Sequence, residues 1–591
     1  LNLRRSFIDS IIGIKLNYFL ELFLSIFIFL YFELKKLRLH YNYFFKFFLK
    51  EIDILKFLRS GFKINEYSFK NKYFSKFLEI NKSKIIKKNK PKVKKNKIVA
   101  ESLINHPIYT LGSCIIANTI SKNKDYNVIG LIRRGDFFST EIMKSFGINE
   151  IKIIDDTNII SRLIYFYRSF FILSKMNDIK KILNLRIKGI DAGRATYEHY
   201  LRFVGESPTK VDWKIISFFA DSLYYIDKSE KILKDIKPKY WIQSERQFLP
   251  HRILSQQALK LKSKVITRNN IDEVSIKLYN NFKERNVGRN KIPYKLFNEI
   301  EKKYKKIILK KSTKLFFSNN KNDNIGKEVH QKLEKKKYKD FKSIEVFNSY
   351  FNFKNSNPVV LILSHEMTDG NFANSWNLFK NDDLWLRRTL KIIKKIKNVN
   401  FIIKSHPSEK FYNSKVTTGK IFAECIFDKD THIQLFPKNY NVNSLINYIS
   451  LSITSHGSAG YQYPAKSIPT IICGDTNYSG LGFCIEPKSI KEYKKLLEKI
   501  PKIKKLNKFQ TNKAKIFWYI YLVIVRVKMP LIYFSNIRMD YDKKLFWKNT
   551  VLNFASLIGD QKKFEKCLMH QIQNNNSNLI NYETLSSNIK K

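Results

Sequence analysis

Cysteine is scarce in this chain, and the few cysteines present form no pattern. There are 5 among 591 residues, scattered and with no CxxC pair. This excludes a disulfide framework and the usual structural zinc motifs. We therefore expect buried free thiols in a reducing compartment. The chain also lacks any internal repeat of solenoid period and any familiar nucleic-acid-binding module.

Acidic residues are few relative to basic ones, and the formal net charge is +58. Lys, Asn, Ile, Phe and Tyr abound, whereas glycine (19) and proline (14) are sparse. The abundant types all have AT-rich codons, so we attribute most of the excess charge to base composition rather than to a nucleic-acid partner. Part of it can serve an anionic membrane, where each nearby Lys or Arg contributes about 1 kcal/mol.

Long apolar runs are limited to two segments. Residues 16–32 form an apolar run interrupted by Glu21 and followed by basic residues. A spanning helix needs roughly 20 mostly apolar residues, so peripheral membrane association is favoured over a buried helix, and both over a true span. Residues 516–534 are interrupted by Arg526 and Pro530, which predicts a buried or interfacial helix.

Alternating strand and helix patterns predict two doubly wound α/β domains with helical extensions at both ends. We expect a basic helical extension and linker over 1–96, a first domain over 97–310, a connecting region over 311–356, a second domain over 357–504 and a helical extension over 505–591. The predicted strands are 97–100, 128–132, 151–155, 240–244, 264–267, 359–364, 399–403, 451–454 and 470–473.

Two polar turns follow predicted strands of the second domain. One is the tetrapeptide KSHP at 404–407, and the other is SHGS at 455–458. Ligands bind at the carboxyl ends of strands in such sheets, and backbone N–H groups opening a helix attract anions, so a nucleotide or phosphate site is expected. A surface His-Pro turn and helix capping by Ser455 or Ser458 are the simpler alternatives. The predicted nucleotide-binding residues are Lys404, His406, Pro407, Thr454, Ser455, His456, Gly457, Ser458 and Gln462.

The segment GYQYPAKSIPTIICGD, at 460–475, resembles a signature of GT-B glycosyltransferases, in which a helix facing the nucleotide and sugar precedes a Pro and a G-x-P-x-I stretch. Gln462 stands where an acidic residue is common, and Ser467 replaces the usual Gly. The expected architecture is therefore GT-B-like, with two Rossmann-type domains, and Gln462 can offer hydrogen bonds but no carboxylate.

Residues 359–484 as a whole resemble bacterial capsule and surface-polysaccharide enzymes, including the capsule Kdo transferases. KSHP is similar to their HP motif and TSHGS to their Ser/Thr motif, and both motifs of such enzymes contact the cytidine phosphate. NYSGLGF, at 477–483, resembles their Y-x-G-x-G segment, which adds Tyr478 and Gly480 as residues of the cleft between the domains.

The first domain offers three carboxylates as catalytic candidates. Asp191 lies in GIDAGRATYEHYLR, which resembles a stretch found near the cleft of surface-carbohydrate proteins. It could be a base or a nucleophile, with Arg194 or Arg202 as an anion contact. Glu245 and Asp136 each follow a predicted strand. A turn aspartate, a cap or a salt bridge is the simpler role for each, and the sequence does not choose among the three.

The resemblance implies a glycosyltransferase of surface or capsular polysaccharide biosynthesis that uses a cytidine-activated sugar such as CMP-Kdo or CMP-sialic acid. A metal-independent reaction without a cofactor is expected, because no DxD motif follows a strand. The expected partners are the nucleotide sugar, a glycan or lipid-linked acceptor and the cytoplasmic face of an anionic inner membrane. A CDP-glycerol or CDP-ribitol phosphotransferase and a non-catalytic polysaccharide-assembly protein are the alternatives.

Overall fold

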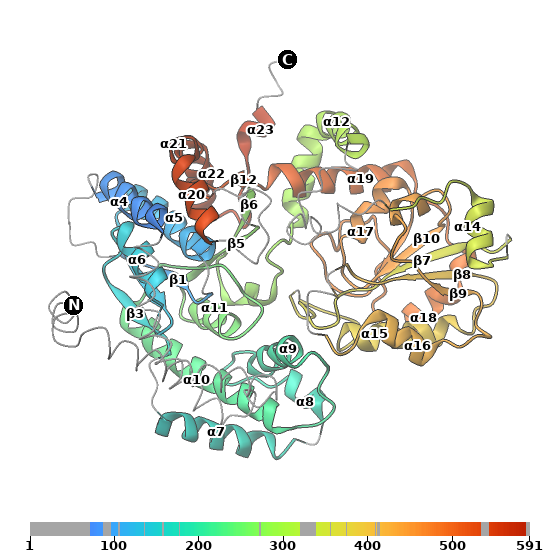
Figure 1. Ribbon diagram of the computed structural model, residues 1–591, viewed down its shortest axis with the longest axis horizontal. Coiled ribbons are helices and arrows are strands. Elements are labelled where there is room, and N and C mark those ends of the chain that lie inside the picture. Colours follow the sequence, from blue (N-terminus) through green and yellow to red (C-terminus); the bar gives the residue numbers. More distant parts are fainter. Residues whose placement is uncertain are drawn as a thin grey trace.

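The computed structural model describes residues 71–86, 96–104, 107–134, 136–155, 159–176, 178–270, 273–318, 338–354, 356–373, 375–407, 409, 414–532 and 543–586. The expectations for residues 1–70, including the apolar run at 16–32, lie outside the described residues. The described chain forms two α/β lobes, which Figure 1 shows with the first domain and the C-terminal helices α20–α22 at the left and the second domain at the right.

The first domain contains a seven-stranded sheet. The strands that are parallel and adjacent, in this order, are β3, β2, β1, β4 and β5. Strand β6 pairs with β5, and β12 pairs with β6, each antiparallel to its neighbour. The strands are β1 (Asn96–Ser102), β2 (Tyr126–Ile132), β3 (Ile151–Ile153), β4 (Tyr240–Gln243), β5 (Lys264–Asn269), β6 (Glu273–Tyr279) and β12 (Val527–Lys528).

The second domain contains a five-stranded, wholly parallel sheet in the order β9-β8-β7-β10-β11. Its strands are β7 (Val359–Leu363), β8 (Asn400–Lys404), β9 (Ile433–Leu435), β10 (Leu451–Thr454) and β11 (Thr470–Ile472). Every residue of β10 and β11 is buried, because helices cover both faces of a parallel sheet.

Helices connect these strands and cover the sheets. Those of the first domain are α4 (Lys72–Ile86), α5 (Pro107–Lys124), α6 (Phe137–Ser145), α7 (Ile159–Leu173), α8 (Ile179–Leu183), α9 (Ala192–Val204), α10 (Trp213–Ile236), α11 (His251–Lys260) and η2 (Phe282–Asn286). Those associated with the second domain are α12 (Tyr294–Ser318), α14 (Ile344–Phe351), α15 (Asp382–Ile393), α16 (Thr418–Cys425), η4 (Val442–Leu445), α17 (Ala459–Gln462), η5 (Pro464–Lys466), α18 (Ile490–Glu498) and η6 (Ile500–Lys502).

The two parallel sheets share one strand order. Numbered along the chain within each domain, both run 3-2-1-4-5, which is the doubly wound Rossmann order. The predicted fold class, two such α/β domains in the GT-B manner with parallel sheets, is confirmed. In each sheet the order reverses beside the first strand, so the two topological switch points lie between β1 and β4 and between β7 and β10.

Several elements differ from the sequence predictions. Strands β6, β9 and β12 were not predicted. Helix α12 crosses the predicted domain boundary at residue 310. It continues because its apolar side chains, including Phe297 and Ile308, join a core with the second domain and the C-terminal segment.

The C-terminal segment contacts both domains. It contains α19 (Lys508–Tyr519), the π-helical turn η7 (Ile520–Ile524), α20 (Lys543–Leu552), α21 (Phe554–Gly559), α22 (Gln561–Gln573) and α23 (Tyr582–Ser586). Helix α19 packs on α12 and α17 of the second-domain side. On the first-domain side, β12 pairs with β6, α20 packs on α4, and α22 packs on α5. This segment therefore joins the two domains, as Figure 1 shows for α19.

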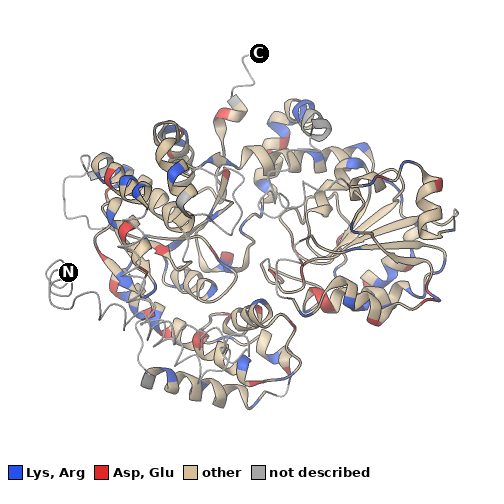
Figure 2. Ribbon diagram, in the orientation of Figure 1, with Lys and Arg blue, Asp and Glu red and all other residues tan. Residues whose placement is uncertain are grey.

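The apolar run at 516–534 is buried protein core where it is described. Ile516, Phe517 and Ile520 are all fully buried in the cluster shared by α12, α17 and α19. No helix among the described residues is both long and apolar enough to cross a membrane. Lysine and arginine are spread over both domains rather than gathered in one (Figure 2).

Candidate functional site

Three histidines lie side by side at the carboxyl edge of the second sheet. In the register of the adjacent strands β10, β7 and β8, Thr454 pairs with Leu363 and Leu363 with Lys404. Each of these residues is followed by Ser-His, so His456, His365 and His406 occupy equivalent positions past three neighbouring strands. The ring centroids of His365 and His456 are 4.0 Å apart, and those of His365 and His406 are 5.4 Å apart. We call these residues the histidine row.

The predicted pair of turns is thus brought together, and a third member of the row was missed. The signal was present in the sequence, because an apolar run ending in Ser-His occurs at 361–365 as well as at 402–406 and 452–456. His365 lies in the middle of the row. Because His365 and His456 follow β7 and β10, the row lies at the switch point, where such sheets bind ligands.

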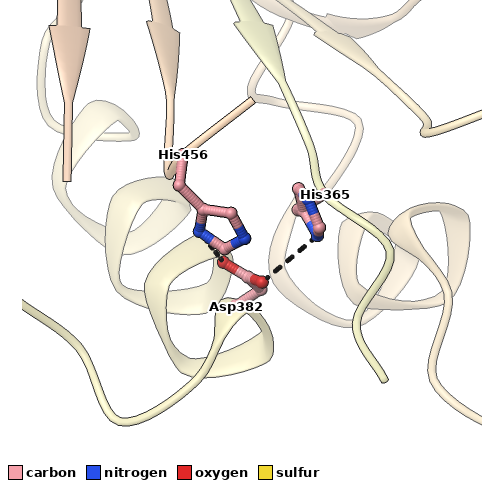
Figure 3. A group of neighbouring side chains, drawn as sticks. All are labelled: His365, Asp382 and His456. Atoms are coloured by element: carbon pink, nitrogen blue, oxygen red, sulfur yellow. Dashed lines mark ion pairs between the residues drawn. The ribbon is translucent and has the colours of Figure 1, made fainter. Parts of the chain in front are cut away.

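Asp382 completes this arrangement from a different element. It is the first residue of α15, whose cap Asn381 accepts a hydrogen bond from the backbone N–H of Leu384. The Asp382 oxygens lie 3.5 Å from Nδ1 of His365 and 3.7 Å from Nδ1 of His456 (Figure 3). A carboxylate from α15 therefore faces both imidazoles at the end of the sheet.

The interior location of these groups alters their protonation. Burial raises the pKa of Asp382, and His365 only partly opposes this effect. Burial, with a smaller contribution from His365, lowers the pKa of His456 well below its ordinary value. Among the described residues, neither ring nitrogen of His456 makes a hydrogen bond. The Oδ2 atom of Asp382 makes none either. The protein alone leaves these polar atoms unsatisfied.

Lys404 supplies a partly buried cation beside the row. Its ammonium donates a hydrogen bond to the carbonyl of Ser405 at 3.3 Å. Burial lowers the pKa of Lys404, and Glu409 opposes the shift. Within the described chain Lys404 forms no ion pair with a carboxylate. An anion bound at the row would give this charge a partner, whereas Pro407 serves to shape the turn that follows.

The turn after β10 is braced from behind by Tyr478. The Tyr478 hydroxyl donates to the carbonyl of Gly457 at 2.5 Å, and the N–H of Gly457 donates to Oγ1 of Thr454 at 3.3 Å. A Cβ on Gly460 would approach the Tyr478 hydroxyl to 2.0 Å, so glycine is required there. Tyr478 is buried and supports the turn, and Gly480 lies in an exposed turn at φ +82°, so neither matches the expected cleft role.

The helix start after β10, where the sequence predicts an anion site, is a single turn. Helix α17 has only 4 residues, and its cap Ser458 makes no side-chain capping bond. The N–H groups of Gly460 and Tyr461 already donate to turn carbonyls. A single turn followed by the 3-10 turn η5 carries little dipole, so an anion there would depend on individual N–H groups and side chains. Gln462 is the last residue of α17.

The departure at Ser467 has a structural explanation. Ser467 adopts φ +67° at the end of η5, a left-handed conformation that usually favours glycine. Its hydroxyl accepts a hydrogen bond from Thr511 on α19 at 3.1 Å. Ser467 therefore occupies the geometry expected for the glycine it replaces and gains a contact to the C-terminal segment.

Asp191 is the first-domain carboxylate whose helix reaches the second domain. It precedes α9 and is held by Arg186 at 2.8 Å and by the side-chain amide of Asn286 at 3.0 Å. Burial would raise the pKa of Asp191, but these partners and Arg285 outweigh it and lower the pKa. Further along α9, the hydroxyl of Tyr197 accepts from Asn381, the neighbour of Asp382, at 2.9 Å.

The other two carboxylates have clear structural partners. Asp136 caps α6 by accepting from the N–H and the hydroxyl of Ser139 at 3.0 and 2.7 Å. Glu245 accepts from two backbone N–H groups and lies 3.4 Å from Arg289. Burial would raise the pKa of Glu245, yet Arg289 and those N–H groups hold it below its ordinary value. Capping and pairing therefore account for both residues.

Arg194 and Arg202 lie where the domains meet. The guanidinium of Arg194 is 5.4 Å from the ring of Phe372, and that of Arg202 lies 3.5 Å from Asp369. Between them, Glu198 accepts from the Phe372 N–H at 3.1 Å and from Arg252 at 2.8 Å. Glu198 and Arg252 could not be selected from the sequence, because their partners come from separate segments. These residues join α9 to the loop after β7.

Comparison with known proteins identifies distant structural neighbours. No family model matches the chain, and no curated protein matches it in sequence. Among solved structures, the β-Kdo 2,7 transferase of KpsC from Thermosulfurimonas dismutans is 12% identical with a TM-score of 0.29, covering 56% of this chain and 89% of that one. The β-Kdo 2,4 transferase of the same protein is 8% identical with a TM-score of 0.27, covering 47% and 79%.

A UDP-GlcNAc 2-epimerase from Neisseria meningitidis, bound to UDP-GlcNAc, is 12% identical with a TM-score of 0.21, covering 72% of this chain and 99% of that one. The strand order and the site themselves define the class of this protein. It is a two-domain α/β protein of GT-B organisation whose polar side chains gather at the switch point of the second domain.

Proposed function

We propose that this chain is a glycosyltransferase of surface or capsular polysaccharide biosynthesis that uses a cytidine-activated sugar such as CMP-Kdo or CMP-sialic acid. The observation that carries the proposal is the histidine row with Lys404 at the second switch point. The three imidazoles, together with an ammonium that makes no ion pair with a carboxylate among the described residues, suit a phosphate, because charge-assisted hydrogen bonds to phosphate are about twice as strong as neutral ones. The resemblance of KSHP and TSHGS to cytidine-phosphate motifs supports the same assignment.

In this proposal the phosphate contacts are shared among the row and its neighbours. His406, Lys404 and His365 approach from the ends of β8 and β7. The hydroxyls of Thr454, Ser455 and Ser458 add hydrogen-bond donors from the turn after β10. His456 is more buried than His365, with side-chain exposures of 7% and 20%, so His365 is the better placed of the two for direct contact. These groups stabilise the negative charge that develops on the departing CMP.

The transfer breaks the bond between the anomeric carbon and the phosphate oxygen, and its electron pair leaves with CMP. The acceptor hydroxyl forms the new bond and loses its proton to a base. A carboxylate with a lowered pKa is ionised at neutral pH and is a weak base, so Asp191 suits the electron-poor anomeric carbon better than the acceptor proton. Glu245 and Asp136 keep their structural partners in this scheme.

A thermal-shift panel of CMP, CDP, UDP and GDP tests the proposal. We expect CMP to give the largest stabilisation of the wild-type protein and His406→Ala to lower CMP affinity by about tenfold, the loss of one charge-assisted contact. His432→Gln is the matched control, because His432 lies in the same domain at the opposite end of the sheet, before β9. Equal CMP binding by wild type and His406→Ala would refute the phosphate assignment.

Product analysis then separates the alternatives. Transfer of a sugar from a CMP donor supports the proposal, whereas transfer of glycerol phosphate from CDP-glycerol would make the chain a polymer phosphotransferase. No nucleotide-dependent shift at all would indicate a non-catalytic assembly protein.

We also propose that the chain acts at the surface of an anionic membrane, and α7 provides the supporting observation. Its exposed side chains are predominantly apolar and aromatic, and the ammonium of Lys175 lies 5.0 Å from the Phe171 ring. The exposed apolar residues of α7 are Leu163, Ile164, Tyr167, Phe170 and Phe171. Such a face with adjacent basic residues is typical of interfacial helices.

Vesicle co-sedimentation tests the membrane contact. The full chain should bind vesicles containing anionic lipid several-fold better than neutral vesicles. The double variant Leu163→Ser with Phe171→Ser should lose most of this binding without loss of CMP binding. Unchanged sedimentation of the double variant would remove α7 from the proposal.

A further inference from the structure

A compact group of three ligand-type side chains lies within the second switch point. His365, Asp382 and His456 come from the end of β7, the start of α15 and the end of β10. Their ligand-type atoms lie within 4.8 Å of one another. Figure 3 shows the carboxylate between the two imidazoles. No other such group of histidine, cysteine and acidic side chains was found among the described residues.

The buried polar atoms of this group lack the partners that burial normally demands. The side chains of Asp382 and His456 are 3% and 7% exposed. Neither nitrogen of His456 nor Oδ2 of Asp382 has a hydrogen-bond partner in the described part of the chain. Such atoms cost about 1–3 kcal/mol each when they remain unsatisfied. The unpartnered atoms indicate a ligand that the described part of the chain does not supply.

The charge of Asp382 selects the kind of ligand. An anion placed directly against this buried carboxylate would be repelled, whereas a cation would be attracted and would give a partner to Oδ2 of Asp382 and to a ring nitrogen of His456. No lysine or arginine forms an ion pair with Asp382 among the described residues; its two ion-pair partners are His365 and His456. A bound cation would therefore balance the carboxylate.

We propose that His365, Asp382 and His456 bind one divalent transition-metal ion of the zinc class. Two imidazoles and one carboxylate form a common ligand set for zinc, with metal–ligand distances of about 2.0–2.2 Å. Tetrahedral ligands at such distances lie roughly 3.4 Å apart. The observed His–Asp separations of 3.5 and 3.7 Å, which involve different oxygens of Asp382, are close to this value, so rotation of the carboxylate and the imidazoles would be needed to place one ion between the three residues.

The supporting contacts hold Asp382 in place for this role. The N–H of Asp382 donates to the side-chain oxygen of Asn371 at 2.8 Å. The preceding residue, Asn381, is fixed by Tyr197 and Ser207 of the first domain at 2.9 and 2.8 Å. Such outer contacts orient the ligands of metal sites. Metal binding here would also couple the ends of α9 and α15.

Three protein ligands leave one position of a tetrahedral site open. This last step rests on the proposed function: the open position would accept an oxygen of the donor phosphate, with the metal between it and Asp382. His365 would then act on the phosphate through the metal, in place of the direct contact proposed for the metal-free row. The reaction would then use a metal, in place of the metal-independent chemistry expected from the missing DxD motif. The metal would stabilise charge on the departing phosphate as a Lewis acid.

Metal binding is tested on the tag-free full chain. After chelator treatment and buffer exchange, zinc is titrated against a chromophoric chelator, and Co²⁺ is followed by its visible absorption. Wild type should bind one equivalent, and His456→Ala and His365→Ala should each bind at least tenfold more weakly. His432→Gln, a histidine variant at the opposite end of the sheet, should bind like wild type.

Binding of less than about one-fifth of an equivalent of zinc by the wild-type protein would overturn the proposal. So would equal affinities of wild type and both alanine variants, which would mark adventitious binding. Because His456 is buried, circular dichroism confirms folding, and the more exposed His365 provides a second variant. Zinc binding without CMP binding would support the metal site and refute the proposed function. CMP binding to metal-free protein, with no zinc uptake, would support the proposed function and refute the metal site.

Discussion

The two switch points have the same strand order but treat their polar groups differently. At the first, between β1 and β4, one oxygen of Glu101 accepts from the N–H of Leu103 at 2.6 Å and the other lies 3.3 Å from His251. At the second, between β7 and β10, the side chains of Asp382 and His456 are 3% and 7% exposed but retain polar atoms without a hydrogen bond in the described chain. The carboxylate and imidazole of the first switch point are thus paired with each other, and the polar atoms of Asp382 and His456 are not fully paired.

The difference shows that topology alone does not assign a ligand site. The same crossover places titratable side chains at the carboxyl edge of both sheets. At the first sheet, Glu101 and His251 pair with each other. At the second, the register of three Ser-His dipeptides gathers three imidazoles, and neither ring nitrogen of His456 has a hydrogen-bond partner among the described residues. The unpartnered atoms of His456 and Asp382 therefore distinguish this group from the Glu101–His251 pair of the first sheet.

The largest expected effect is on stability, at the paired contact between α9 and the second domain. Glu198 and Arg252 are both buried and 2.8 Å apart. Glu198→Ala would leave the guanidinium of Arg252 buried without its carboxylate, which should cost about 3–5 kcal/mol. Urea unfolding measures the loss. Glu198→Gln retains an acceptor and should cost less, and equal costs for both variants would show that the charge is unimportant.

A smaller effect, dependent on pH, is expected at the edge of the first sheet. Burial lowers the pKa of Lys277 on β6 to about 7, although its ammonium donates to the Lys291 carbonyl and to Asn578. In the unfolded chain the pKa is near 10.5, so the unfolded state binds more protons between pH 7 and 10.5. The contribution of Lys277 to stability should therefore rise with pH across that window.

Each unit of pKa difference corresponds to about 1.4 kcal/mol, so the rise between pH 7 and 9 should be on the order of 2 kcal/mol. Chemical unfolding at several pH values measures it for wild type and for Lys277→Met. The variant should lose this part of the slope. Parallel slopes for the two proteins would show that Lys277 titrates normally in the folded state.

The smallest change in stability is expected at the second switch point. Asp382→Asn removes a buried carboxylate that lacks a cationic partner other than histidine, so metal-free protein should change by less than about 1 kcal/mol or become more stable. The same variant should bind zinc at least tenfold more weakly. Thermal unfolding of the metal-free protein measures the first effect. A destabilisation as large as that of Glu198→Ala would place Asp382 among the structural pairs.

Much of the fold was predictable because buried parallel strands are apolar runs. The segments that became β1, β2, β7, β8 and β10 all have this character. Strand β6, EVSIKLY, alternates polar and apolar residues and follows β5 after a short connection, so its pairing depended on tertiary context. Helix α12 crossed the expected boundary because a helix ends where its packing partners end, and those lie in the C-terminal segment.

The site was predictable only where its residues followed a strand directly. His406 and His456 were found in this way, and His365 could have been, since it follows β7 with the same Ser-His pair. Asp382 could not, because it opens a helix rather than following a strand, and only the packing of α15 brings it beside the histidines. The length of α17, a single turn, was not predictable from the apolar pattern either.

The central claim is that nucleotide phosphate binds at the second switch point rather than the first. Calorimetric titration of CMP into His365→Ala and into His251→Gln compares the two most directly, because His251 is the first-domain counterpart, paired with Glu101. We predict at least tenfold weaker CMP binding for His365→Ala and wild-type affinity for His251→Gln. Wild-type affinity for His365→Ala, with loss of binding in His251→Gln, would contradict the account.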